Sequence, residues 1–185
     1  MDVLKNDKEF KEAIGALVIS SSEMEFAICR LCSMVGEDPR EHQDRLFQYW
    51  GKRLEEKRKA VSDFIKVQTP ELHSEWTLIN AEIGKLNEDR NFLVHGFVQY
   101  YLPNTEVVTY RKKNGKIIKK QFSINDIRVL TNKIHQINTG TNGINGVFQT
   151  KFFLARINNW NNQVEESRRM IYRVNDEVLS DWKGI

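Results

Sequence analysis

Apolar residues recur at helical spacing through the first third of the chain and predict two long helices. The first, of about 30 residues, has Asn6 as its capping residue and ends at Gly36 and Pro39. A second apolar face covers residues 41–67, where Gly51 can bend the helix. The face of the first helix consists of Phe10, Ile14, Leu17, Met24, Ile28, Leu31 and Val35.

A third helix is predicted to begin at Thr69-Pro70-Glu71, where a capping residue precedes a proline and an acidic residue of the first turn. Three long helices in succession favour an antiparallel helical bundle. The seam of the third helix reads Leu72, Trp76, Ile79, Ile83, Leu86, Arg90 and Leu93.

The hydrophobic period then changes. Asn114-Gly115 lies between β-prone segments, and a type I′ turn needs positive φ at both of its central residues, so we expect a β-hairpin over about residues 105–122. Ser123 and Asp126 form a capping box for a fourth helix, which should break at residues 139–143. Apolar spacing resumes at Ile144, and the tail from residue 160 is expected to be helical.

Length and composition favour one mainly α domain over residues 1–185. Its parts are a helical core at about 6–97, the hairpin at about 105–122 and C-terminal helices at about 123–185. The chain has 185 residues, of which 40% are hydrophobic and 29% charged. No apolar run approaches the roughly 20 residues that span a bilayer, and no signal peptide is evident. With two cysteines we expect a reduced, cytoplasmic protein without a membrane role.

Arg90 is an anomaly, because it falls on the apolar spacing of the third helix and should point into the bundle or an interface. A guanidinium there costs several kcal/mol unless it is paired or left in a wet cleft. A structural ion pair with Glu25 or Glu88 is one interpretation. The other is a site, since polar Asn91 follows directly and His95 stands five residues on, before Gly96.

A five-residue step turns about 140° around an ideal helix, so Arg90 and His95 cannot reach one point from a straight helix. They can do so where the helix ends, and Gly96 is a natural residue for that ending. A second copy of the helix could also bring the two together across a two-fold axis. A lone histidine in a last turn, by contrast, often only stabilises the helix dipole.

The segment Asp89-Arg90-Asn91-Phe92-Leu93-Val94-His95-Gly96 resembles the motif of HEPN domains: an arginine, an adjacent polar residue, and a histidine after four to six positions, late in a long bundle helix. It is similar to bacterial HEPN-like proteins with a DRNxxxHG signature. The segment 22–26, with Glu25, resembles their preceding glutamate-bearing helix, and a β-hairpin often follows their motif. The resemblance covers roughly residues 6–138, and the last 45 or so have no counterpart.

This resemblance implies a metal-independent endoribonuclease that acts as a homodimer with a composite active site and needs no cofactor. Arg90, Asn91 and His95 would be catalytic, with Glu25 and Asp89 in support. The products would carry 2′,3′-cyclic phosphate and 5′-hydroxyl ends. Such a protein would be the effector of a toxin–antitoxin or anti-phage system, with a possible antitoxin or inhibitor as partner. The alternatives are a non-catalytic dimerising adaptor that binds RNA or a partner protein and, less directly, a small-molecule sensor.

Two basic clusters and a cysteine pair remain open to other interpretations. The cluster around the hairpin turn could grip an RNA backbone or only protect edge strands from aggregation: Arg111, Lys112, Lys113, Lys116, Lys119 and Lys120. The basic residues of 52–59, interrupted by Glu55 and Glu56, are typical of a solvated helix face. Cys29 and Cys32 have CxxC spacing but no second pair for zinc, so core cysteines are expected.

Overall fold

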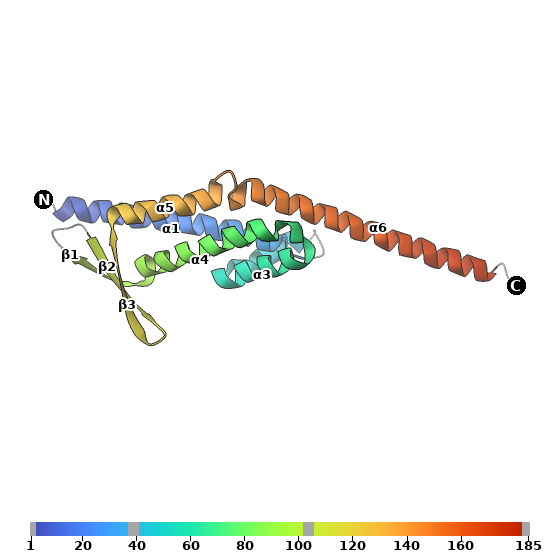
Figure 1. Ribbon diagram of the computed structural model, residues 1–185, viewed down its shortest axis with the longest axis horizontal. Coiled ribbons are helices and arrows are strands. Elements are labelled where there is room, and N and C mark those ends of the chain that lie inside the picture. Colours follow the sequence, from blue (N-terminus) through green and yellow to red (C-terminus); the bar gives the residue numbers. More distant parts are fainter. Residues whose placement is uncertain (1–2, 37–40, 102–105, 183–185) are drawn as a thin grey trace.

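The structure of the protein is a computed structural model that describes residues 3–36, 41–101 and 106–182. Four helices form an elongated bundle: α1 (Val3–Ser33), α3 (Leu54–Gln68), α4 (His73–His95) and α5 (Ile124–Thr139) (Figure 1). The apolar seams meet in one core, whose fully buried side chains include Leu17, Ile28, Ile65, Trp76, Ile83, Ile127 and Ile134. The predicted mainly helical fold is confirmed.

Two predicted helix boundaries need correction. α1 is already helical at Val3, so Asn6 lies inside the helix and does not cap it. The early turns are held by packing of α1 against α5, in which Phe10 and Ala13 are buried, and this packing overrides the local signal. Residues 41–67 form two helices, α2 (His42–Trp50) and α3, which separate at Gly51.

The start of α3 explains this break. The backbone N–H of Arg53 donates to a carboxylate oxygen of Glu56 at 2.8 Å, so the chain behind Gly51 has its own helix cap. The third predicted helix begins near its expected position, with a single 3₁₀ turn (Pro70–Leu72) ahead of α4.

An antiparallel sheet follows α4, with strands in the order β1 (Phe97–Tyr101), β2 (Glu106–Lys113) and β3 (Lys116–Ser123). Asn114 and Gly115 have φ values of 51° and 78°, which confirms the predicted type I′ hairpin. β1, which pairs Phe97 with Tyr110 of β2, was not predicted. The hairpin leans away from the bundle beside the end of α4 (Figure 1).

The C-terminal part begins with the predicted capping box: the Asp126 backbone N–H donates to Ser123 Oγ at 3.0 Å, and the Ser123 N–H donates to the Asp126 carboxylate at 2.8 Å. After α5 the chain turns, as expected, and forms the short helix η3 (Ile144–Phe148). The final helix α6 (Gln149–Trp182) extends far beyond the bundle (Figure 1). Every helix in the described part of the chain is too short or too polar to span a lipid bilayer.

Candidate functional site

The candidate site lies where α4 ends and the chain enters β1. α4 ends at His95 because Gly96 takes up an extended conformation, with φ −82° and ψ 158°. A Cβ atom at Gly96 would collide with the Phe92 carbonyl oxygen and lie 3.2 Å from the carbonyl oxygen of Tyr110 in β2. Only glycine therefore allows helix and sheet to approach this closely.

The structure brings the three predicted catalytic side chains together within one chain. Arg90 Nη1 donates to Asn91 Oδ1 at 3.0 Å and lies 3.2 Å from His95 Nε2. Arginine has donors only, so Nε2 must accept and the ring proton of His95 must sit on Nδ1.

Arg90 is half-buried, whereas His95 is exposed. Arg90 Nε is enclosed without a hydrogen-bond partner in the described part of the protein. The two recorded partners of the guanidinium, Asn91 and His95, are not carboxylates. The structure therefore does not support an ion pair of Arg90 with Glu25 or Glu88.

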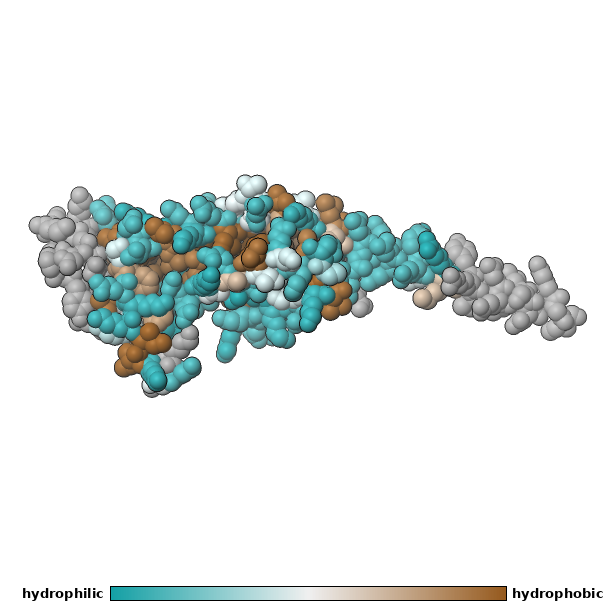
Figure 2. Space-filling view, viewed as in Figure 1, coloured by the Kyte–Doolittle hydropathy of each residue, from teal (hydrophilic) through white to brown (hydrophobic). Residues whose placement is uncertain are grey.

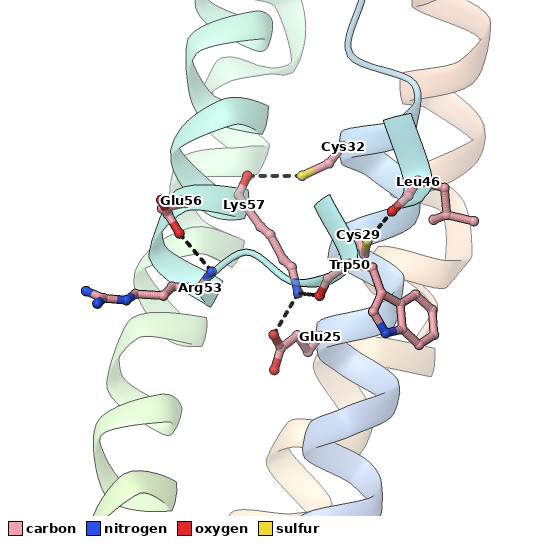
Figure 3. A network of polar contacts seen from close by, with 8 residues as sticks. All are labelled: Glu25, Cys29, Cys32, Leu46, Trp50, Arg53, Glu56 and Lys57. Atoms are coloured by element: carbon pink, nitrogen blue, oxygen red, sulfur yellow. Dashed lines mark hydrogen bonds and ion pairs between the residues drawn. The ribbon is translucent and has the colours of Figure 1, made fainter. Parts of the chain in front are cut away.

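The predicted support of Arg90 by Glu25 is wrong. Figure 3 shows Glu25 of α1 facing α3, where its carboxylate lies 2.7 Å from Lys57 Nζ. The Lys57 side chain is only 3% exposed and also donates to the Trp50 carbonyl oxygen at 3.3 Å. A buried ammonium needs a counter-charge, and this need fixes the position of Glu25. The expectation of a solvated face over 52–59 also fails at Lys57, and at half-buried Arg58.

Asp89 does lie beside the site, where it anchors the hairpin. Lys120 Nζ of β3 lies 2.7 Å from Asp89 Oδ1 and 4.7 Å from the centre of the Phe92 ring, which gives an ion pair and a cation–π contact on neighbouring turns of α4. From the sequence, Lys120 is expected to bind RNA or to protect an edge strand. No local pattern signals its pairing with Asp89, because the two partners are 31 residues apart.

Strand alternation divides the predicted basic ribbon between the two faces of the hairpin. Lys116 and Lys120 are on the face of the hairpin that turns toward α4. Exposed Lys119 is on the opposite face. Ile117 at the tip is 75% exposed, and Figure 2 shows apolar groups in this part of the hairpin beside hydrophilic ones. Arg111 is half-buried, and the side chains of Lys112 and Lys113 are outside the described residues.

His95 lies at the protein surface, and the pockets at the hairpin-distal end of the bundle are lined by other residues. One pocket, of about 770 Å³, lies between α3 and α6 and is bordered by Phe64, Val67 and Trp160. Among the residues that the structure describes, no three His, Cys, Asp or Glu side chains converge as a metal site requires.

Cys29 and Cys32 are buried core residues, as predicted. Cys32 Sγ donates to the Lys57 carbonyl oxygen at 3.2 Å, and Cys29 Sγ donates to the Leu46 carbonyl oxygen at 3.6 Å (Figure 3). Burial raises the pKa of Cys32 to about 12, so its thiol stays protonated.

Comparisons with protein-family models, with curated proteins and with solved structures found no match to this chain. Function is therefore inferred from the chemistry of the residues themselves.

Proposed function

We propose that the protein is a metal-independent endoribonuclease of the HEPN type, with Arg90, Asn91 and His95 as its catalytic residues. The observation that carries this proposal is the meeting of the three side chains at the open end of α4, where Arg90 Nη1 reaches both other residues. A cation, an amide and an imidazole on one exposed surface match the needs of RNA cleavage.

RNA supplies its own nucleophile, the 2′-hydroxyl group. A neutral imidazole accepts the proton of this group, the 2′-oxygen attacks the phosphorus, and the bond to the 5′-oxygen breaks. The 5′-oxygen then takes up a proton, so the products are a 2′,3′-cyclic phosphate and a 5′-hydroxyl. DNA lacks the nucleophile and should remain intact.

The Arg90–His95 contact gives the site a resting state. While Nη1 donates to Nε2, the lone pair of the imidazole is occupied. A phosphodiester offers the guanidinium stronger, charged acceptors. Binding of substrate would therefore draw Arg90 onto the phosphate oxygens and free His95 Nε2 to act as the base.

A homodimer would supply the second proton transfer. With two motifs facing one cleft, one imidazole accepts the 2′-hydroxyl proton while the protonated imidazole of the second copy donates to the leaving 5′-oxygen. The open position of the motif suits such a composite site. In this proposal the protein is the toxic effector of a toxin–antitoxin or anti-phage system, and an antitoxin or inhibitor would cover the same surface.

The hairpin would add binding energy along the RNA backbone. Lys116 and Lys119 are exposed near the turn, and the Asp89–Lys120 pair fixes β3 against α4. Phosphate contacts of this kind do not depend on base sequence and weaken as salt increases.

The test is incubation of the purified protein with tRNA in EDTA, followed by analysis of the RNA ends. We expect cleavage by the wild type and a loss of at least about 100-fold for His95→Ala, as for removal of a general acid–base group. His135→Ala is the matched control, because His135 is exposed on α5 and contacts Thr139. Equal cleavage by wild type and His95→Ala, or ends other than cyclic phosphate, would refute the assignment.

One observation favours the non-catalytic adaptor as a second candidate. Phe26 and Trp50, which are 42% and 61% exposed, meet edge to face at 5.5 Å, and exposed Phe47 precedes Trp50 by one turn of α2. Exposed aromatic residues of this kind are typical of protein-docking surfaces. Intact RNA with both the wild type and His95→Ala, together with loss of a partner in Trp50→Ala, would favour the adaptor.

A further inference from the structure

The outer part of α6 has no neighbour in the described part of the chain. Its first turns are bound to the bundle: Phe152 is buried, Lys151 pairs with Glu75 at 2.8 Å, and Asn159 donates to the Gln68 carbonyl oxygen at 3.3 Å. Further on, Glu165 and Arg168 pair within the helix itself. Figure 1 shows this part leaving the bundle. At 1.5 Å per residue, residues 160–182 extend for roughly 35 Å.

α6 carries an apolar stripe at alternating steps of four and three residues, which begins beside the bundle and continues into the projecting segment. Phe153, Ile157 and Trp160 are 46%, 36% and 37% exposed and line the pocket between α6 and α3, and half-buried Val164 follows at the next step. The same spacing continues in the sequence through Ile171, Val174 and Val178, with polar Ser167 as an interruption. A stripe of this kind sustained over more than three heptads is the pattern of a coiled coil.

Beside the stripe, the surface of residues 160–169 is hydrophilic. Glu165, Glu166 and Arg169 lie off the stripe and are exposed, and Figure 2 displays a mostly hydrophilic face on this part of α6. A single helix that projects into water with an exposed apolar stripe is marginally stable, since most helical stability in proteins comes from packing of that stripe. Packing of the stripe against a partner would therefore stabilise this segment.

A second copy of α6 fits this stripe. With Ile157 at position a of the heptad, positions a are all β-branched, namely Ile157, Val164, Ile171 and Val178. In parallel coiled coils, β-branched residues at a favour two strands when leucine occupies d; the d positions here are Trp160, Ser167 and Val174. Asn161 and Gln163, which flank the stripe, are uncharged, so no like charges repel a second helix there.

We propose that α6 forms a parallel two-stranded coiled coil with α6 of a second copy of this chain, from about residue 157 to residue 178. The surface is distinct from the Arg90 motif, so the pairing holds whether or not the protein cleaves RNA. Parallel pairing places both bundles at the same end of the coiled coil, whereas antiparallel pairing would place them at opposite ends.

The first test measures the mass of the full chain by sedimentation equilibrium. We expect a dimer. We expect Val164→Lys to raise the dissociation constant of this dimer by at least about tenfold, because the seam then buries one lysine from each copy. Asn162→Lys adds the same charge on the outer side of the helix and should leave the dimer unchanged. A monomeric wild type, a trimer, or equal effects of the two substitutions would overturn the proposal.

The second test identifies the surface and its direction, because another interface could also hold two chains together. Ser167 occupies a seam position, and parallel helices bring its two copies to the same level. Ser167→Cys should link covalently under mild oxidation, whereas Arg169→Cys, on the outer side, should not. Buried Cys29 and Cys32 contribute no background. Failure of Ser167→Cys to link in a dimeric, folded chain, or equal linking at position 169, would overturn the proposal.

Discussion

Replacement of Arg90 by methionine separates a structural role of the guanidinium from a chemical one. Methionine keeps most of the apolar stem of arginine but removes all hydrogen-bond donors. If Arg90 were the partner of a buried carboxylate, its loss would cost about 3–5 kcal/mol of folding free energy. The recorded partners Asn91 and His95 lead to a different expectation.

The expected change in stability is small because two effects oppose each other. Arg90 Nη1 makes both contacts within its own helix, at a site open to water, so water replaces them at little cost. Arg90 Nε is enclosed without a partner, a state that costs about 1–3 kcal/mol and that methionine removes. We therefore expect Arg90→Met to change the free energy of unfolding by no more than about 1 kcal/mol in either direction.

Arg58 is the matched control, since it is also half-buried but fully engaged. Its Nε donates to Asn80 Oδ1 at 2.6 Å and its Nη2 to the Asn80 carbonyl oxygen at 2.7 Å, which joins α3 to α4. Two such bonds from a charged group predict a loss of about 2–4 kcal/mol for Arg58→Met. Urea unfolding followed by circular dichroism measures both values.

Cleavage of tRNA in EDTA is the second measurement made on Arg90→Met and Arg58→Met. Arg90→Met should cleave at least about 100-fold more slowly than the wild type, because the phosphate loses its charged donors. Arg58→Met should retain activity under conditions in which it is folded. A loss of stability for Arg90→Met as large as that for Arg58→Met would refute the assignment of Arg90 to chemistry, as would full cleavage activity.

Three further predictions concern the packing of the bundle. Glu25→Gln should cost about 1–3 kcal/mol in urea unfolding, because it leaves the Lys57 ammonium without its counter-charge while the partly exposed site admits some water. Hydrogen bonds from Ser123 lower the pKa of Asp126 below its usual 3.8, so the carboxylate stabilises the folded state above that value. Asp126→Asn should therefore cost about 1 kcal/mol at neutral pH, and the difference from wild type should disappear as the pH falls through the folded pKa. Cys32, with a pKa of about 12, should resist alkylation at pH values near 8 until the protein unfolds, as measured by mass spectrometry.

Each of these experiments has an internal control. The exposed Lys59–Asp63 pair, at 3.2 Å, should contribute no more than about 0.5 kcal/mol, so an Asp63→Asn cost equal to that of Glu25→Gln would contradict the burial argument. A pH-independent effect of Asp126→Asn would contradict the charge-assisted cap. Rapid alkylation of the folded protein would contradict the buried position of the thiol.

The helices were predictable where local signals and the core agree. At Ser123 the cap, the first turn and the apolar face of α5 all point to the same start, and the structure has that start. At Asn6 the local cap signal competes with packing of α1 against α5, and packing prevails. Periodicity alone predicts one helix across Gly51. The low helix propensity of glycine and the cap that Glu56 provides to the Arg53 N–H divide it into two.

Pairings between distant residues could not be predicted from the spacing of residues. β1 forms because Phe97–Tyr101 pairs with β2, and the aromatic and β-branched residues of 97–101 are the signal that could have revealed it. The sequence places Lys57 in a solvated basic run, because its partner Glu25 lies 32 residues earlier in the chain. The nearest local evidence for burial is the apolar positions Leu54, Val61 and Ile65, which place Lys57 on the inner face of α3.

The meeting of Arg90 and His95 depends on side-chain reach rather than on helix phase. Cβ positions five residues apart differ by about 140°, which argues against contact on an ideal helix. Side chains in helices, however, lean toward the N-terminus, so the His95 ring is displaced back toward the turn that holds Arg90. The long arginine stem covers the rest, and because α4 ends at His95 no following turn of helix lies beside the ring. The same pair in the middle of a helix would lack this freedom, so the position of the motif at the helix end, secured by Gly96, is what lets the two groups meet.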